Sequence, residues 1–184
     1  MKNLLVIYMD WNAQAPFIMA FMKFAILASL GEALAVRIQT GSGGIVAGWQ
    51  KKAIVWGFLG MAVAWVIPIY AAGVASLGIS SKLLTAFLTS LTMNLSFGPV
   101  LMVTHRISET RIELKEKGES ATAEAIFAAN DWLGFFRFAL VKTNLFFWIP
   151  MHTITFLLPP VWRLLMAAML SMALGILLAF ARRR

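Results

Sequence analysis

Four long stretches of this 184-residue chain contain no Asp, Glu, Lys or Arg. They cover residues 53–81, 83–104, 143–162 and 164–181, which together make up nearly half of the protein. A helix needs roughly 20 mostly apolar residues to cross the hydrocarbon core of a bilayer. A soluble domain of this length has no room to bury four helices that are apolar on every side. The chain is therefore expected to lie in a membrane.

The composition agrees with this class. Hydrophobic residues make up 60% of the chain and charged residues only 13%, which is typical of a polytopic helical membrane protein. The formal net charge of +8 comes from basic residues that are scattered or follow apolar segments, so lipid headgroups rather than nucleic acid are the expected partner. No cleavable signal sequence is recognisable, and a bacterial inner membrane is the simplest location, with an organelle membrane as the alternative.

The pattern of apolar segments predicts an all-α membrane protein. We expect a single domain over residues 1–184, folded as one polytopic bundle of about five helical segments that make four to five spans. The predicted segments cover residues 16–38, 53–77, 82–104, 132–157 and 161–180. A charged helical loop outside the membrane is expected over 105–131, between the third and fourth segments.

The basic residues also predict an orientation. With five spans, Lys2, Lys82 and Arg163 fall on the side of the amino terminus, and ten other Lys and Arg residues fall on the opposite side. Because cytoplasmic loops carry an excess of Lys and Arg, we expect the amino terminus outside and the carboxyl terminus in the cytoplasm. If the segment 132–157 were re-entrant, this assignment would fail.

Several short motifs resemble those of a known family. Ser29-Leu30-Gly31-Glu32 is followed by Gln39, and near the other end lie Trp148-Ile149-Pro150, Phe156, Pro160 and Arg163. On these residues the chain resembles the Mpv-type family of small peroxisomal and mitochondrial membrane proteins, which has bacterial members. The resemblance implies a helical bundle that passes small solutes or ions through a narrow pore.

Ionisable residues inside the predicted spans are the main candidates for function. Each costs about 2.5 to 3.5 kcal/mol on insertion scales, so its presence at membrane depth needs a reason. If the fourth segment packs against the first, Glu32 would meet Arg137 or Lys142 and leave one cation for a pore wall. In the alternative, Arg137 and Lys142 extend to the interface and Glu32 is a structural partner of Arg37 or Lys142. The candidate pore or charge-pair residues are thus Lys23, Glu32, Arg37, Arg137 and Lys142.

A second group of polar residues surrounds a predicted helix break. His152, Thr153 and Thr155 follow Pro150, where a broken helix leaves carbonyl groups available to side chains or to a solute. Simple helix packing is the alternative explanation for these three residues.

The sequence predicts neither an enzyme nor a metal or cofactor site. His105 and Glu109 are four residues apart, but no third metal ligand lies near them in the sequence. Absence of cysteine excludes disulfides and thiolate chemistry. We find no catalytic side-chain set in a convincing context, and no loop suited to binding phosphate.

Two functions fit these features. The first is a channel or pore for small solutes or ions. The second is a non-transporting structural or accessory subunit of a membrane complex. The second rests on a stripe of small residues that suits close helix contact with another copy or a membrane partner, formed by Ala167, Ser171, Gly175 and Ala179.

Overall fold

The computed structural model describes residues 3–41 and 47–182, which are helical with no strand. This confirms the all-α prediction. The elements are α1 (Leu4–Gln14), α2 (Pro16–Thr40), α3 (Trp49–Ala75), α4 (Lys82–Glu116), α5 (Ala123–Ala128), α6 (Trp132–Phe135), the π-helix η1 (Phe136–Trp148), α7 (Ile149–Leu157) and α8 (Pro160–Arg182).

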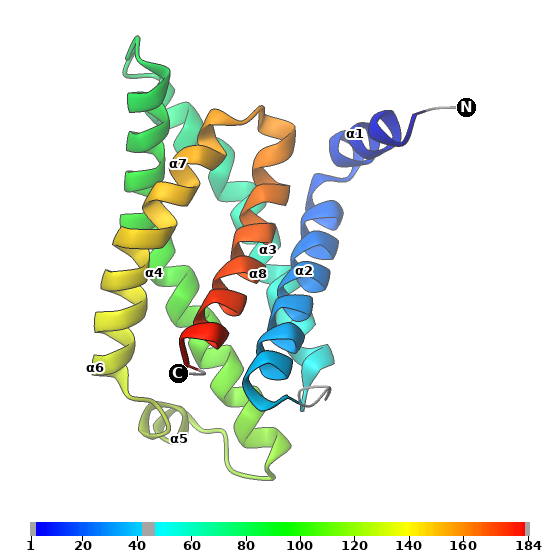
Figure 1. The fold of residues 1–184 in the computed structure, drawn as a ribbon, viewed down its shortest axis with the longest axis vertical. Helices are drawn as coiled ribbons and strands as arrows, with labels where there is room; N and C mark the ends of the chain where they lie inside the picture. Colours follow the sequence, from blue (N-terminus) through cyan, green and yellow to red (C-terminus); the bar gives the residue numbers. More distant parts are fainter. Residues whose placement is uncertain (1–2, 42–46, 183–184) are drawn as a thin grey trace.

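The long helices run up and down beside one another (Figure 1). The upper end of the bundle carries α1 and the α3–α4 connection, and the lower end carries α5 and the end of α8. Among the described residues, α2, α3, α4 and α8 are long and apolar enough to span a membrane. The continuous segment 132–157, formed by α6, η1 and α7, also runs from the lower to the upper end. It is therefore a fifth pass along the bundle and does not fold back as a re-entrant segment.

The third predicted segment is longer than the sequence indicated. We expected it to end near Thr104, but α4 continues to Glu116 because no Gly or Pro occurs between Thr104 and Gly118, which has a φ of 75°. At 1.5 Å per residue its 35 residues extend for roughly 52 Å, against about 30 Å for the hydrocarbon core. The lower turns of α4 therefore stand beyond the bilayer, where α5 follows them.

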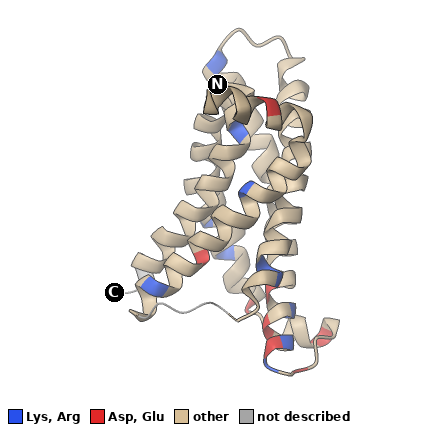
Figure 2. Cartoon of the chain, turned by 90° about the vertical axis from the view of Figure 1, so that its right-hand side faces the viewer, with Lys and Arg blue, Asp and Glu red and all other residues tan. Residues whose placement is uncertain are grey.

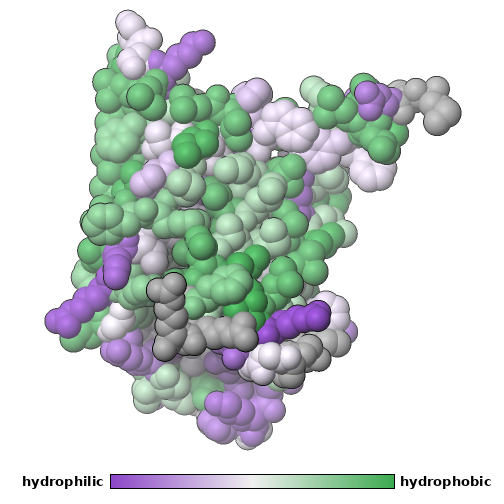
Figure 3. All heavy atoms as spheres, viewed as in Figure 1, coloured by the Kyte–Doolittle hydropathy of each residue, from purple (hydrophilic) through white to green (hydrophobic). Residues whose placement is uncertain are grey.

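The surface has the pattern of a protein embedded in lipid. Charged residues gather toward the ends of the bundle, most of them at the lower end (Figure 2). Hydrophobic side chains cover much of the face between the ends (Figure 3). Large apolar side chains such as Phe58 and Trp65 are more than 60% exposed, which is favourable only in an apolar solvent. The predicted orientation relative to the cytoplasm stays a prediction, and of the residues behind it Lys2, Arg183 and Arg184 lie outside the described ranges.

Small residues allow α2 to pack closely on both of its neighbours. A Cβ atom added at Gly60 of α3 would lie 2.6 Å from Phe24, and one added at Gly31 of α2 would lie 2.8 Å from the Cα atom of Met172 in α8. The stripe predicted on α8 lies partly in this contact, since Ala167 and Ala179 are buried and a Cβ at Gly175 would lie 3.8 Å from the carbonyl oxygen of Gly31.

The α8 stripe is therefore used within the single chain. Its Ser171 donates a hydrogen bond to the carbonyl of Ala167 in the same helix, at 3.2 Å. The sequence suggested these residues as a contact for another copy or a membrane partner, but the structure places them against α2 and along an internal cavity.

The backbone contact at Gly31 generates a testable prediction. Gly31→Ala should destabilise the protein by about 1 to 3 kcal/mol, because the added methyl group overlaps the α8 backbone. Gly73→Ala in α3 is the matched control, since a Cβ there meets nothing within 4 Å and alanine favours helix. Thermal unfolding in detergent should show a lower midpoint for Gly31→Ala only. Equal midpoints for the two variants would contradict the close α2–α8 packing.

Candidate functional site

A cavity of about 380 Å³ lies inside the lower half of the bundle. We call it the lower cavity. Its lining runs from Gln39 near the end of α2 and Glu109 of α4 to Met93, Asn94 and His152, which belong to α4 and α7. Its lining is mainly apolar and aromatic. The polar side chains that line it are those of Glu32, Gln39, Asn94, His105, Glu109, Thr143, His152 and Ser171.

Glu32 places a carboxylate in the wall of this cavity. It lies in α2, and its Oε1 accepts a hydrogen bond of 2.9 Å from the indole Nε1 of Trp56 in α3. The Trp56 ring in turn packs against the ring of His105, with 4.2 Å between ring centroids. Among the described residues, no ion pair within 4 Å involves Glu32.

The neighbouring lysine is already neutralised by other carboxylates. Lys52 lies one turn before Trp56 on α3, and its ammonium group is 3.2 Å from both Glu109 and Glu113 of α4. The Lys52 side chain is only 7% exposed. Arg106 adds a longer contact of 3.7 Å to Glu109. These pairs tie the start of α3 to the lower turns of α4.

The deep end of the lower cavity holds a buried polar cluster. The Nδ2 of Asn144 in η1 donates to the backbone carbonyl of Asn94 in α4 at 2.7 Å, and the Nδ2 of Asn94 donates to the carbonyl of Ser90 at 2.8 Å. Because a carbonyl only accepts, these bonds determine which amide atom is oxygen. Both amide oxygens face Gly98, where an added Cβ would lie 3.7 Å from each.

This cluster leaves acceptor capacity beside the cavity. Asn144 is 1% exposed, and its Oδ1 has no hydrogen-bond donor among the described residues. The Oδ1 of Asn94 lies 3.1 Å from Nδ1 of His152, whose ring stacks on Trp148. Asn94 and His152 line the cavity, whereas Asn144 is not part of its lining. A buried acceptor without a donor is unfavourable, so Asn144 Oδ1 costs the fold stability.

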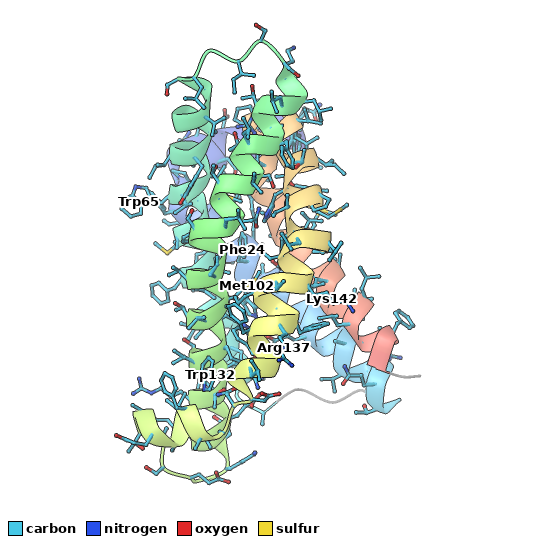
Figure 4. All side chains as sticks on the ribbon, turned by 90° about the vertical axis from the view of Figure 1, so that its left-hand side faces the viewer. Phe24, Trp65, Met102, Trp132, Arg137 and Lys142 are labelled. Carbon is cyan, nitrogen blue, oxygen red and sulfur yellow. The ribbon has the colours of Figure 1, made fainter. Side chains whose placement is uncertain are left out.

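The structure does not bring Glu32 together with Arg137 or Lys142. Both cations lie on η1 (Figure 4), are exposed, and form no ion pair among the described residues. The predicted charge pair is therefore replaced by the Glu32–Trp56 hydrogen bond. Phe24, by contrast, lies between the helices and Trp65 lies on the outside (Figure 4).

Lys23 and Arg37, the other predicted charges, lie away from the lower cavity lining. The Lys23 ammonium donates to the side chain of Asn12 and lies 4.9 Å from the centre of the Tyr8 ring, so it attaches α1 to the bundle. Tyr8 also stacks on Trp162 at the start of α8, with ring centroids 5.3 Å apart. Arg37 occupies the last turn of α2, where a cation is favourable near the carbonyl end of a helix.

Of the three residues predicted around Pro150, only His152 lines the lower cavity. The Thr153 and Thr155 hydroxyls donate to carbonyls four residues earlier in their own helix, those of Ile149 and Met151. The Ile149 carbonyl also accepts a hydrogen bond of 2.7 Å from Ser90 in α4. The predicted helix break is thus a place where α4 attaches to α7.

A second cavity of about 380 Å³ lies at the upper end, lined in part by Lys82 and Arg163. A cluster of buried hydrophobic residues borders both this cavity and the lower cavity. Within this cluster, which we call the hydrophobic barrier, Ala86 and Phe156 line the upper cavity. Its other members include four that line the lower cavity, namely Phe24, Val63, Met93 and Ala167, and the cluster is completed by Ile67 and Ala168.

Several residues in and around the lower cavity were not predicted as site residues from the sequence. Lys52 immediately precedes an uncharged run and was assigned to a loop. If residues 49–52 are treated as the first turn of a helix, the i,i+4 spacing places Lys52 and Trp56 on one face of it. The same spacing places Glu109 and Glu113 on one face of α4, so the sequence does contain a signal for this cluster. Asn94 and Ser90 have the same spacing, whereas no local signal identifies Asn144.

Compared with known proteins, this chain matches no family model, no curated protein and no solved structure. Its resemblance to the Mpv-type family therefore stays a prediction. The geometry of the site is the basis for everything proposed below.

The two adjacent lysines of α3 allow a matched test of the buried ion pair. Lys52→Met should destabilise the protein by about 3 kcal/mol, because it leaves two carboxylates facing each other in a partly buried position. Lys51→Met should cost less than about 1 kcal/mol, since Lys51 is 60% exposed and pairs with Glu116 at the surface. Thermal unfolding in detergent measures both. If the two variants unfold alike, Lys52 does not have the structural role assigned to it.

Proposed function

We propose that this integral membrane protein is a channel or pore for small polar solutes or ions, captured in a closed state. The observation that carries the proposal is the presence of two cavities in one helical bundle, with residues of the hydrophobic barrier in the lining of both. The upper cavity is lined by the end of α3, the start of α4, the end of α7 and the start of α8, and the lower cavity is lined mainly by α2, η1 and later residues of α4 and α8.

The lining of the cavities supports passage of a polar species. The lower cavity exposes carboxylate, amide and imidazole groups at membrane depth, where such groups are costly and usually serve a function. The upper cavity has the cationic side chains of Lys82 and Arg163 in its lining. A bundle stabilised by packing alone would be expected to fill this space with apolar side chains, because interiors are close-packed.

The hydrophobic barrier accounts for the closed state. Phe24, Met93 and Phe156 are each less than 7% exposed, and they come from α2, α4 and α7. A narrow apolar constriction excludes water and so blocks ions without any charged gate. Opening then requires side chains from opposite sides of the bundle to separate by enough to admit water.

The alternative of a purely structural subunit has lost its specific support. It rested on the small-residue stripe of α8, which packs against α2 and lines the lower cavity. No other feature of the described residues favours it over the pore.

A polar substitution in the barrier should open the path. Met93→Ser should raise the conductance of purified protein in planar bilayers about tenfold, equal to roughly 1.4 kcal/mol off the barrier, because a hydroxyl group there retains water. Met169→Ser is the control, since Met169 is 44% exposed on α8 and lies outside the barrier. If the folded protein and both variants show no conductance at any applied voltage or with any solute, the pore is ruled out.

A further inference from the structure

We propose that the lower cavity is a binding site for an organic cation with an apolar body. Its charged group would lie at Glu32, and its body would lie among the aromatic rings deeper in the cavity. The site deepens the proposed function, because it lies on the proposed path, yet binding can be measured without any transport.

The charges around the cavity select for a cation. Glu32 and Glu109 line it, and no Lys or Arg is found among the described residues of its lining. Glu109 is occupied by Lys52 and Arg106, at 3.2 and 3.7 Å. The Glu32 carboxylate has only the indole of Trp56 as a hydrogen-bond donor among the described residues. An anionic ligand would find no partner in this lining, whereas a cation would compensate the charge of Glu32.

The rings around Glu32 favour an organic cation. The Trp56 nitrogen is bonded to the Glu32 carboxylate, so the apolar substituents of a cation placed at that carboxylate would lie beside the edge of the indole. Further aromatic side chains line the rest of the cavity, namely Phe24, Phe97, Phe135, Phe138 and Trp148. Ring faces attract quaternary and other organic ammonium groups and offer little to a hydrated inorganic ion.

A divalent metal ion fits this site poorly. Among the described residues, no group of three or more His, Cys, Asp or Glu side chains is placed to hold a metal. Hard cations such as Ca²⁺ require six or more oxygen ligands, and the lower cavity provides isolated oxygens separated by apolar surface. The donor set therefore matches an ammonium group on an apolar body.

The size and surroundings of the cavity agree with a small organic ligand. Its volume of about 380 Å³ falls within the roughly 300 to 1,000 Å³ typical of ligand sites. Residues of η1 line one side and residues of α8 line the other, namely Phe138 and Ala139 against Leu174 and Leu178. The helix α8 packs mainly on α2, and η1 packs on α4, which keeps space between these two walls.

The test uses two probes of similar shape and opposite charge. Benzyltrimethylammonium and phenylmethanesulfonate are titrated into the purified full-length protein in detergent by isothermal calorimetry, with detergent alone as the blank. The cation should bind at least tenfold more tightly than the anion. Equal affinity for the two probes, or no binding of the cation above the blank, would overturn the proposal without reference to any variant.

Two pairs of variants then locate the site. Glu32→Gln should weaken binding of the cation at least tenfold, and Glu124→Gln, which removes an exposed charge on α5, should leave it unchanged. Trp56→Leu should also weaken binding at least threefold, whereas Trp65→Leu removes a lipid-facing ring and should not. Folding is checked by size-exclusion chromatography and circular dichroism. If the Glu32→Gln and Trp56→Leu variants both fold and bind the cation with unchanged affinity, the cation binds elsewhere and the assignment is refuted.

Flux measurements separate this inference from the proposed pore. In liposomes containing the protein, a channel that conducts small ions but does not bind benzyltrimethylammonium would refute the cation site and leave the pore intact. If the protein binds the cation specifically but shows no conductance in bilayers, the pore is refuted and the cation site is supported.

Discussion

The lower half of the bundle depends on how Lys52 is neutralised. This lysine lies at the start of α3, where the helix enters the apolar region, and its side chain is almost fully buried. Two carboxylates on consecutive turns of α4, Glu109 and Glu113, hold its ammonium group at equal distances of 3.2 Å. Since Lys52 is occupied there, the hydrogen-bond donor to Glu32 is the neutral indole of Trp56. The same ion pairs hold α3 against α4 and so define one wall of the site.

The fold was largely predictable because a bilayer permits few solutions. Every backbone polar group in lipid must be bonded within the protein, so long uncharged runs become helices wherever they occur. Which side chains meet depends on how each helix is rotated about its own axis, and the sequence did not reveal this rotation for η1. Hydrogen bonds in a π-helix run to the fifth residue, so Arg137 and Lys142, five apart, lie near one another on one side. That side is exposed, and neither cation reaches Glu32.

The small-residue pattern shows a second limit of the same kind. Gly31, Gly60 and the α8 stripe all indicate close helix approach, and in the structure each is used for it. The pattern does not say whether the approaching helix belongs to the same chain, because close contact stabilises intramolecular and intermolecular pairs by the same dispersion forces. In the structure α2 packs against both α3 and α8. In the structure the stripe contacts a helix of its own chain, and the predicted contact with another copy or a membrane partner stays a prediction.

These packing differences define two groups of helices. In one, glycine contacts hold α2 closely to α3 and α8. In the other, hydrogen bonds from Ser90 and Asn144 hold α4 to α7 and η1. The hydrophobic barrier draws apolar side chains from both groups, but polar contacts also join them, from Lys52 to Glu109 and Glu113 and from Arg163 to the Phe156 carbonyl. In the proposed pore, opening would separate the dispersion contacts of the barrier and strain these polar contacts, so its energetic cost exceeds that of wetting a short apolar segment.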